Sequence, residues 1–217
     1  MSGVNGARDP ARHDARGALV LELRRAGLSN VDVLRAIETV PRELFTPFRL
    51  RDLANRNCPL PIACGQTMHA PGVIASMLTA LDLAPDHRVM EIGAGAGYAL
   101  AILARLAREV VSFERFRSLA VEARARLARL GVTNAEIVVA DGFAAPERYG
   151  QFDRIVVHAA LPAPPERLFV ALKPGGRIVC GLDGREGERI AIVSPGVVQR
   201  LQPCRLGRPL AGVAAAL

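Results

Sequence analysis

The chain has 217 residues, of which 50% are hydrophobic, and a formal net charge of +7. This length suits one domain with a full-sized core, and the apolar content excludes a chain that is disordered throughout. No apolar run approaches the roughly 20 residues of a membrane-spanning helix, and the arginines are scattered without interleaved aromatic residues, so neither a membrane nor nucleic acid is expected as a partner.

The first 84 residues predict a polar lead-in followed by a helical region with a long loop. Residues 1–16 contain no hydrophobic signal core and are expected to be disordered. Within residues 17–84, the loop at 41–71 is broken by prolines, and an irregular segment of this length tends to be functional. Helices are expected over residues 18–26, from Ser29 or Asn30 to Pro41, and from Pro71 with Ile74, Met77, Leu78 and Leu81 on one face.

From residue 85 to residue 217, apolar strands alternate with helices. This alternation predicts an α/β fold with a doubly wound, mostly parallel, Rossmann-like sheet. Near the C-terminus the pattern changes to two strands joined by a Ser-Pro-Gly turn, which indicates antiparallel strands at the sheet edge. Strands are expected at residues 88–92, 110–113, 136–139, 154–157, 177–182, 189–193 and 197–201, and helices at 98–107, 118–130 and from the loop 162–165 to Leu172.

The most specific local motif follows the first of these strands. Residues 89–97 read Val-Met-Glu-Ile-Gly-Ala-Gly-Ala-Gly, with glycines at Gly93, Gly95 and Gly97. Glycine permits a tight strand-to-helix turn and lets a ligand lie against the backbone. A dinucleotide fingerprint would place its third glycine at position 98, where this chain has Tyr98. The motif therefore favours S-adenosylmethionine over a nicotinamide cofactor.

Acidic residues follow the next two strands at the positions where a nucleoside needs them. In an open parallel sheet, ligands bind beyond the carboxyl ends of the strands. Glu114 ends the second strand, and its carboxylate can accept both hydroxyls of a ribose. Asp141-Gly142 follows the third strand, where a carboxylate can accept from an adenine amino group. Together with the glycine turn, these acids predict a nucleoside-binding site.

The chain also resembles a known family, from about residue 18 to the C-terminus, including the tail around Arg208-Pro-Leu210. The first motifs, V-P-R-E-L-F, P-L-P-I and G-Q-T, are specific to protein-L-isoaspartate O-methyltransferases. The later motifs, from E-I-G-x-G-x-G onward, are shared by many methyltransferases. These motifs occur here, in the family's order, at residues 40–45, 59–62, 65–67, 91–97, 141–142, 152–153 and 172–176.

The resemblance implies an S-adenosylmethionine-dependent enzyme that methylates the α-carboxyl of L-isoaspartyl residues in damaged proteins, the first step of their repair. It implies that Glu114 holds the ribose, that Asp141-Gly142 borders the adenine, and that residues 93–97 lie under the methionine part. The residues assigned on this basis to the cofactor site are Gln66, Thr67, Glu91, Gly93, Ala94, Gly95, Gly97, Glu114, Arg115, Asp141 and Gly142.

Two histidines depart from the family pattern in the expected acceptor site. His69 stands where the family usually has serine, and His158 stands where it usually has a small residue such as threonine. A carboxylate acceptor is already a nucleophile at pH 7 and needs positioning rather than a general base. A protonated histidine could hold such a carboxylate, whereas a neutral one could deprotonate a hydroxyl acceptor. His69, Thr67 and His158 are therefore the candidate catalytic residues, and both acceptor chemistries stay open.

Other functions compete with this interpretation. The acceptor could be a different carboxylate or a hydroxyl, on a small molecule or a peptide, or the chain could be a non-catalytic S-adenosylmethionine-binding module. No metal is expected, because His69 and His158 have no convincing third ligand. The cysteines form no C-x-x-C pair, which points to a cytoplasmic protein without a disulfide framework; they are Cys58, Cys64, Cys180 and Cys204.

Overall fold

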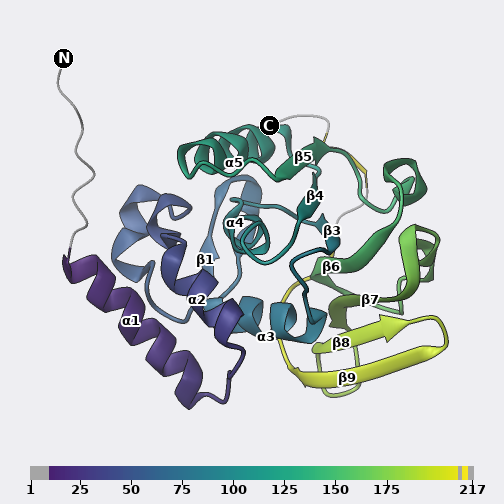
Figure 1. Ribbon diagram of the computed structural model, residues 1–217, viewed down its shortest axis with the longest axis horizontal. Coiled ribbons are helices and arrows are strands. Elements are labelled where there is room, and N and C mark those ends of the chain that lie inside the picture. The colour runs from purple at the N-terminus through teal and green to yellow at the C-terminus, as the bar shows by residue number, and fades with distance from the viewer. Residues whose placement is uncertain (1–9, 210–211, 215–217) are drawn as a thin grey trace.

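A seven-stranded sheet organises the computed structural model, which describes residues 10–209 and 212–214 (Figure 1). Its strand order is β5-β4-β3-β6-β7-β8-β9. The first five strands in this order run parallel, and β8 and β9 continue the sheet antiparallel. The strands are β3 (Arg88–Ile92), β4 (Glu109–Glu114), β5 (Ala135–Val139), β6 (Phe152–Leu161), β7 (Leu172–Leu182), β8 (Arg189–Ser194) and β9 (Val197–Pro203).

This topology confirms the predicted doubly wound, mostly parallel sheet with antiparallel edge strands. The chain builds β3, β4 and β5 outward in one direction and then returns to place β6 on the other side of β3. The order therefore reverses between β3 and β6. In open sheets of this kind, the crevice at the carboxyl ends of the strands at such a reversal is the usual ligand site.

The two faces of the sheet are covered differently. Alternating strand residues enter two separate cores: Val89 and Val110 belong to one, and Met90 and Val111 to the other. The first core also holds side chains of α1 to α5, whereas the second is closed by short 3-10 segments. Figure 1 shows the α-helices to the left of the sheet and the green 3-10 turns to its right. The helices between the strands are α4 (Tyr98–Leu103) and α5 (Arg117–Arg129), and the 3-10 segments are η4 (Pro146–Tyr149) and η5 (Glu166–Ala171).

The N-terminal region packs three helices against the first core. They are α1 (Pro10–Arg25), α2 (Val31–Thr39) and α3 (Pro71–Leu81). Residues 10–16 are helical, so the expectation of disorder was wrong for them, since Pro10 starts α1 and alanines follow it. Residues 1–9 of the expected lead-in lie outside the described part of the chain. The loop between α2 and α3 contains η1 (Arg42–Leu44), η2 (Phe48–Leu53), η3 (Ala63–Gly65) and the antiparallel pair β1 (Leu60–Pro61) and β2 (Thr67–Met68).

Several element boundaries differ from those that the sequence predicts. Helix α4 ends at Leu103 rather than at residue 107, and the Asn134 side chain donates to the carbonyls of Ala104 and Ala107 just beyond it. A 3-10 segment, η5, replaces the α-helix expected before Leu172. Strand β6 continues to Leu161, so His158 lies within the strand rather than after it. The β6–β7 register is irregular between Val156 and Ala160, which includes His158.

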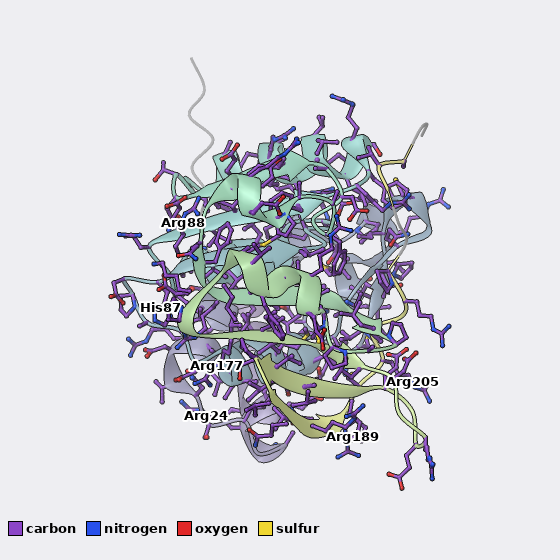
Figure 2. All side chains as sticks on the ribbon, turned by 90° about the vertical axis from the view of Figure 1, so that its right-hand side faces the viewer. Arg24, His87, Arg88, Arg177, Arg189 and Arg205 are labelled. Carbon is purple, nitrogen blue, oxygen red and sulfur yellow. The ribbon has the colours of Figure 1, made fainter. Side chains whose placement is uncertain are left out.

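The positive charge is distributed over the molecule. Figure 2 labels Arg24 on α1, Arg88 on β3, Arg177 on β7, Arg189 on β8 and Arg205 in the segment that follows β9. Among the described residues, none of the helices has the length and apolar character to cross a membrane.

Candidate active site

The glycine turn between β3 and α4 forms the floor of the candidate site. Gly93, Gly95 and Gly97 have φ values of +97°, +54° and +92°, which favour glycine over any residue with a Cβ. The turn is also held from β4, because the Gly93 amide donates to the carbonyl of Phe113 over 2.8 Å. The sequence therefore needs glycine here for backbone geometry as well as for ligand approach.

Glu114 ends β4 directly beside this turn. Its Oε2 accepts from the Gly95 amide at 2.8 Å, and its Oε1 accepts from the Phe116 amide at 2.9 Å. Glu114 is only 5% exposed, and burial raises the pKa of its carboxyl, while the backbone donors oppose that rise. These two hydrogen bonds from backbone amides fix a buried carboxylate in a defined orientation next to the glycine turn.

Asp141 follows β5, and backbone amides bind both of its carboxylate oxygens. Oδ1 accepts from the Phe143 amide at 2.9 Å, and Oδ2 accepts from the Gly212 amide at 2.8 Å. The second bond brings the C-terminal segment to the site, where Arg115 also donates from Nε to the carbonyl of Gly212. Asp141 lies after the strand that the sequence predicts before it, but nothing in its local pattern indicates that the tail returns here.

A cavity of about 330 Å³ connects these strand ends with the loop before α3. Apolar side chains on β3, β4 and the loops after β4 and β5 form part of its walls, and sequence reasoning did not single them out: Ile92, Phe113, Phe116 and Phe143. The sequence does contain a signal for these four residues, since each lies within a few residues of the carboxyl end of a predicted strand. The tail segment 206–209 lines the same cavity. A smaller cavity of about 90 Å³ continues over the glycine turn.

These cavities bring together most of the predicted site residues. The larger one is lined by Gln66, Thr67, His69, Gly93, Glu114, Arg115, Asp141, Gly142 and His158. The smaller one adds Ala94 and Gly95. Glu91 and Gly97 line neither cavity. Hollows of about 430 and 580 Å³ exist elsewhere, but their walls contain none of the residues that follow the parallel strands.

The loop before α3 is held in place by Arg42, the arginine of V-P-R-E-L-F. Its guanidinium is buried and donates to the backbone carbonyls of Ala54, Arg56, Cys58 and His69 at 2.9–3.1 Å. Each of these carbonyls belongs to the proline-rich loop that the sequence marks as functional. Arg42 therefore positions the loop through its backbone.

His69 lies at the end of this loop and meets β6. Its Nε2 is 3.3 Å from the backbone carbonyl oxygen of His158. Because a carbonyl can only accept, this contact assigns the ring proton to Nε2. Burial, together with the neighbouring ring of His158, lowers the pKa of His69 to about 4, so the His69 ring is neutral at neutral pH.

His158 contacts a buried carboxylate that comes from the neighbouring strand. Its Nε2 is 2.9 Å from Oε1 of Glu91, and the two side chains are 5% and 0% exposed. Glu91 is also bonded from β4, where the Ser112 hydroxyl donates to Oε2 at 2.5 Å. The Nδ1 of His158 is buried and has no hydrogen-bond partner among the described residues. Among those residues, no group of three or more histidine, cysteine and acidic side chains could hold a metal ion.

Comparisons with known proteins identify relatives that share most of this chain. Residues 14–194 match the family model for protein-L-isoaspartate(D-aspartate) O-methyltransferase. The chain is 48% identical over 193 residues to protein-L-isoaspartate O-methyltransferase 2 of Rhodopseudomonas palustris (strain HaA2), covering 89% of this chain and 87% of that protein. It is 47% identical over 173 residues to the protein-L-isoaspartate O-methyltransferase of Nitrobacter winogradskyi, covering 80% of each chain.

A solved structure supports the fold at lower identity. The crystal structure of a putative protein-L-isoaspartate O-methyltransferase from Plasmodium falciparum, in complex with S-adenosyl-L-homocysteine, superimposes with a TM-score of 0.78. It is 22% identical and covers 89% of this chain and 97% of that chain. At this identity the likeness concerns the fold alone.

Proposed function

Because the chain belongs to the protein-L-isoaspartate(D-aspartate) O-methyltransferase family, and is therefore an S-adenosylmethionine-dependent methyltransferase, we propose that it methylates the α-carboxylate of L-isoaspartyl residues in damaged proteins or peptides. The observation that carries the proposal is the meeting of two regions on one cavity. The donor side contributes Gly93 and Glu114, and the family-specific loop contributes Gln66, Thr67 and His69.

The residues present fit the cofactor. Glu114 is a buried carboxylate beside a glycine turn, and each of its oxygens has further acceptor capacity for ribose hydroxyls. Ile92 and Phe113 offer an apolar slot for the adenine ring, next to Gly142. The glycine turn is expected to hold the methionine part, and its residues 93–95 line the smaller cavity. When bound, S-adenosylmethionine supplies a methyl group on a positively charged sulfur, which an oxygen nucleophile can take.

The acceptor side is formed by Thr67, His69 and His158. An isoaspartyl α-carboxylate is ionised at neutral pH, so these residues need only hold it in line and exclude water. His69 is neutral at neutral pH, and its Nε2–H donates a hydrogen bond to the backbone carbonyl of His158. The neutral His69 ring therefore orients the acceptor by shaping the site, rather than by forming an ion pair with the acceptor carboxylate.

The direct experiment compares two peptides that differ only in one linkage. The purified protein is incubated with methyl-labelled S-adenosylmethionine and either an L-isoaspartyl peptide or its L-aspartyl counterpart. We expect label to enter only the isoaspartyl peptide, as a base-labile methyl ester. Binding of S-adenosylhomocysteine without turnover of either peptide would contradict the proposal and direct the search to other acceptors, hydroxyl compounds included.

We also propose a cytoplasmic location. The support is chemical: all four cysteines are free thiols, which is the usual state in a reducing compartment. Separation of the source cells into cytoplasmic, membrane and extracellular fractions, followed by the isoaspartyl assay, tests this location.

A further inference from the structure

A row of hydrogen bonds runs across three neighbouring strands beneath the acceptor site. Ser112 on β4 bonds to Glu91 on β3, and Glu91 bonds to His158 on β6. The register makes this row possible, because Glu91 lies opposite Ser112 on one side and opposite Val156 on the other. Only His158 lines the cavities, so Glu91 and Ser112 can act on the site only through it.

The direction of each bond follows from the groups involved. The Ser112 hydroxyl donates to Oε2, and an ionised carboxylate can only accept. With Glu91 ionised, Nε2 of His158 carries a proton and donates it to Oε1. With Nε2 protonated, Nδ1 has two possible states: a bare nitrogen in a neutral ring or an N–H in a cationic ring.

The other ring nitrogen, Nδ1, has no hydrogen-bond partner among the described residues, although it is buried. A buried polar atom without a partner is costly unless a ligand or water supplies one. The ring lines both cavities, so a partner bound there can reach it. When an acceptor carboxylate leaves water and enters the cavity, it comes near the carboxylate of Glu91. This transfer is favourable only if a positive charge lies between the two carboxylates.

From this geometry we propose that Glu91, held by Ser112, is a positioning residue that keeps His158 as a cationic ring whose Nδ1–H binds the acceptor carboxylate. This inference rests on the proposed carboxylate acceptor. It resolves the two chemistries that the sequence leaves open, because a ring that is already doubly protonated cannot deprotonate a hydroxyl. It also makes the site selective for charged acceptors over amides, which need no cation.

Other charges around His158 do not replace this role. His69 is neutral at neutral pH because its pKa is about 4. Glu114 is committed to the backbone amides of Gly95 and Phe116. The titratable groups that share the cavities with His158, or bond to it, are His69, Glu91, Tyr98, Glu114, Arg115, Asp141 and Arg208. Within this set Glu91 alone is hydrogen-bonded to the His158 ring.

The kinetic test compares Glu91→Gln with Glu109→Gln, which removes the same charge from a partly exposed pair with Arg88 at the far end of β4. The first substitution keeps the shape of the side chain and removes its charge. We expect the KM for the isoaspartyl peptide to rise on the order of tenfold or more, the size of one lost charge-assisted bond, with kcat changed far less. As the pH is raised, we also expect 1/KM of Glu91→Gln to begin to fall at a lower pH than 1/KM of the wild type. Glu109→Gln should change neither quantity.

The affinity for S-adenosylhomocysteine, measured by calorimetry, separates this role from a cofactor contact. It should be the same in Glu91→Gln and in the wild type. A loss of that affinity with an unchanged peptide KM would overturn the inference and make Glu91 a cofactor residue. Should Glu91→Gln fail to fold, Ser112→Ala removes only the supporting hydrogen bond and is expected to raise the same KM to a smaller extent.

A spectroscopic measurement decides the point without turnover. Nitrogen-15 NMR of the histidine rings, in the complex with S-adenosylhomocysteine and the isoaspartyl peptide at pH 7, should show protons on both ring nitrogens of His158, and one proton fewer in Glu91→Gln. His158→Asn identifies the resonances. A bare Nδ1 in the wild-type complex would overturn the inference. If the wild type methylates no isoaspartyl peptide, the proposed function fails, and the same spectrum of the complex with S-adenosylhomocysteine alone reports whether Glu91 holds the ring cationic.

Discussion

Arg42 donates from Nη2 to the backbone carbonyl of His69 over 3.1 Å, although 27 residues separate the two along the chain. The same guanidinium bonds three further carbonyls of the intervening loop. A buried arginine that follows α2 thus positions the end of the loop at residues 41–71 and the place where the His69 ring contacts β6. This relationship links the stability of the N-terminal region to the geometry of the site.

Replacement of Arg42 by methionine should therefore affect both stability and acceptor binding. Methionine fills part of the volume but leaves four carbonyls without their donor. We expect the free energy of unfolding, measured in urea, to fall on the order of 3 kcal/mol. In the folded fraction the peptide KM should rise. The exposed Arg49→Met is the matched control, and an equal loss in both variants would contradict the role given to Arg42.

Glu114 should make cofactor binding dependent on pH. Burial raises the pKa of its carboxyl above the ordinary value of 4.5. Acidification therefore protonates Glu114 earlier than an exposed glutamate, and protonation removes acceptor capacity for ribose hydroxyls. We expect the affinity for S-adenosylhomocysteine to weaken as the pH falls toward 5. Calorimetry between pH 5 and 8 measures this, and Glu114→Gln should bind weakly at every pH in that range.

The same shift has a consequence for stability, with a defined sign. A carboxyl whose pKa is raised in the folded state binds protons more tightly there than in the unfolded chain. Its contribution to the free energy of unfolding therefore decreases as the pH rises from 4.5 through the raised value. The free energy of unfolding of ligand-free protein in urea should show this slope, and Glu114→Gln should lack that part of it.

His69 should act on stability in the opposite direction. Its pKa falls from 6.5 to about 4 on folding, so the unfolded chain binds a proton that the folded protein does not. The stability contribution is complete above pH 6.5 and is lost as the pH falls toward 4. We expect His69→Gln to lose less stability than the wild type between pH 7 and pH 5 in urea titrations. Identical losses in the two proteins would show that His69 does not titrate in this way.

Gly142 tests the shape of the adenine slot. An added Cβ would lie 2.8 Å from Cγ1 of Ile92 and 3.1 Å from Cβ of Phe113. Gly142→Ala should therefore push these walls into the cavity, weaken S-adenosylhomocysteine binding and lower stability by about 1–3 kcal/mol. Gly17→Ala, in α1 with open space around its Cβ, is the contrast and should raise stability by about 0.5–1 kcal/mol.

The elements that the sequence predicts well are those that a local pattern specifies. The apolar runs at 88–92 and 110–113 are strands because their residues enter cores on both faces, as Val89 and Met90 do. The boundaries are less predictable where distant residues decide them. Asn134 donates to the carbonyls of Ala104 and Ala107, which follow the last turn of α4. The extension of β6 through His158 depends on its pairing with β7.

The candidate site divides in the same way. Glu114, Asp141 and the glycine turn are recognisable because each follows an apolar strand, and parallel strands end at one edge of a sheet. Sequence patterns did not reveal that the Gly212 amide would bind Asp141, 71 positions earlier. Ile92 and Phe113 lie at the ends of β3 and β4, but their strand positions alone do not say that both side chains line one cavity.

The amino-acid sequence by itself determined the mostly parallel α/β fold and the family, and it predicts which residues form the methyl-donor site, because these inferences depend on periodicity and on motifs read within a few residues. Only the tertiary structure decided the environment of His158. Its carboxylate partner Glu91 lies 67 positions away, and the hydroxyl that holds Glu91 comes from a third strand. Such partners meet through strand order and register. These arise only when the whole sheet forms, and no local sequence pattern contains them.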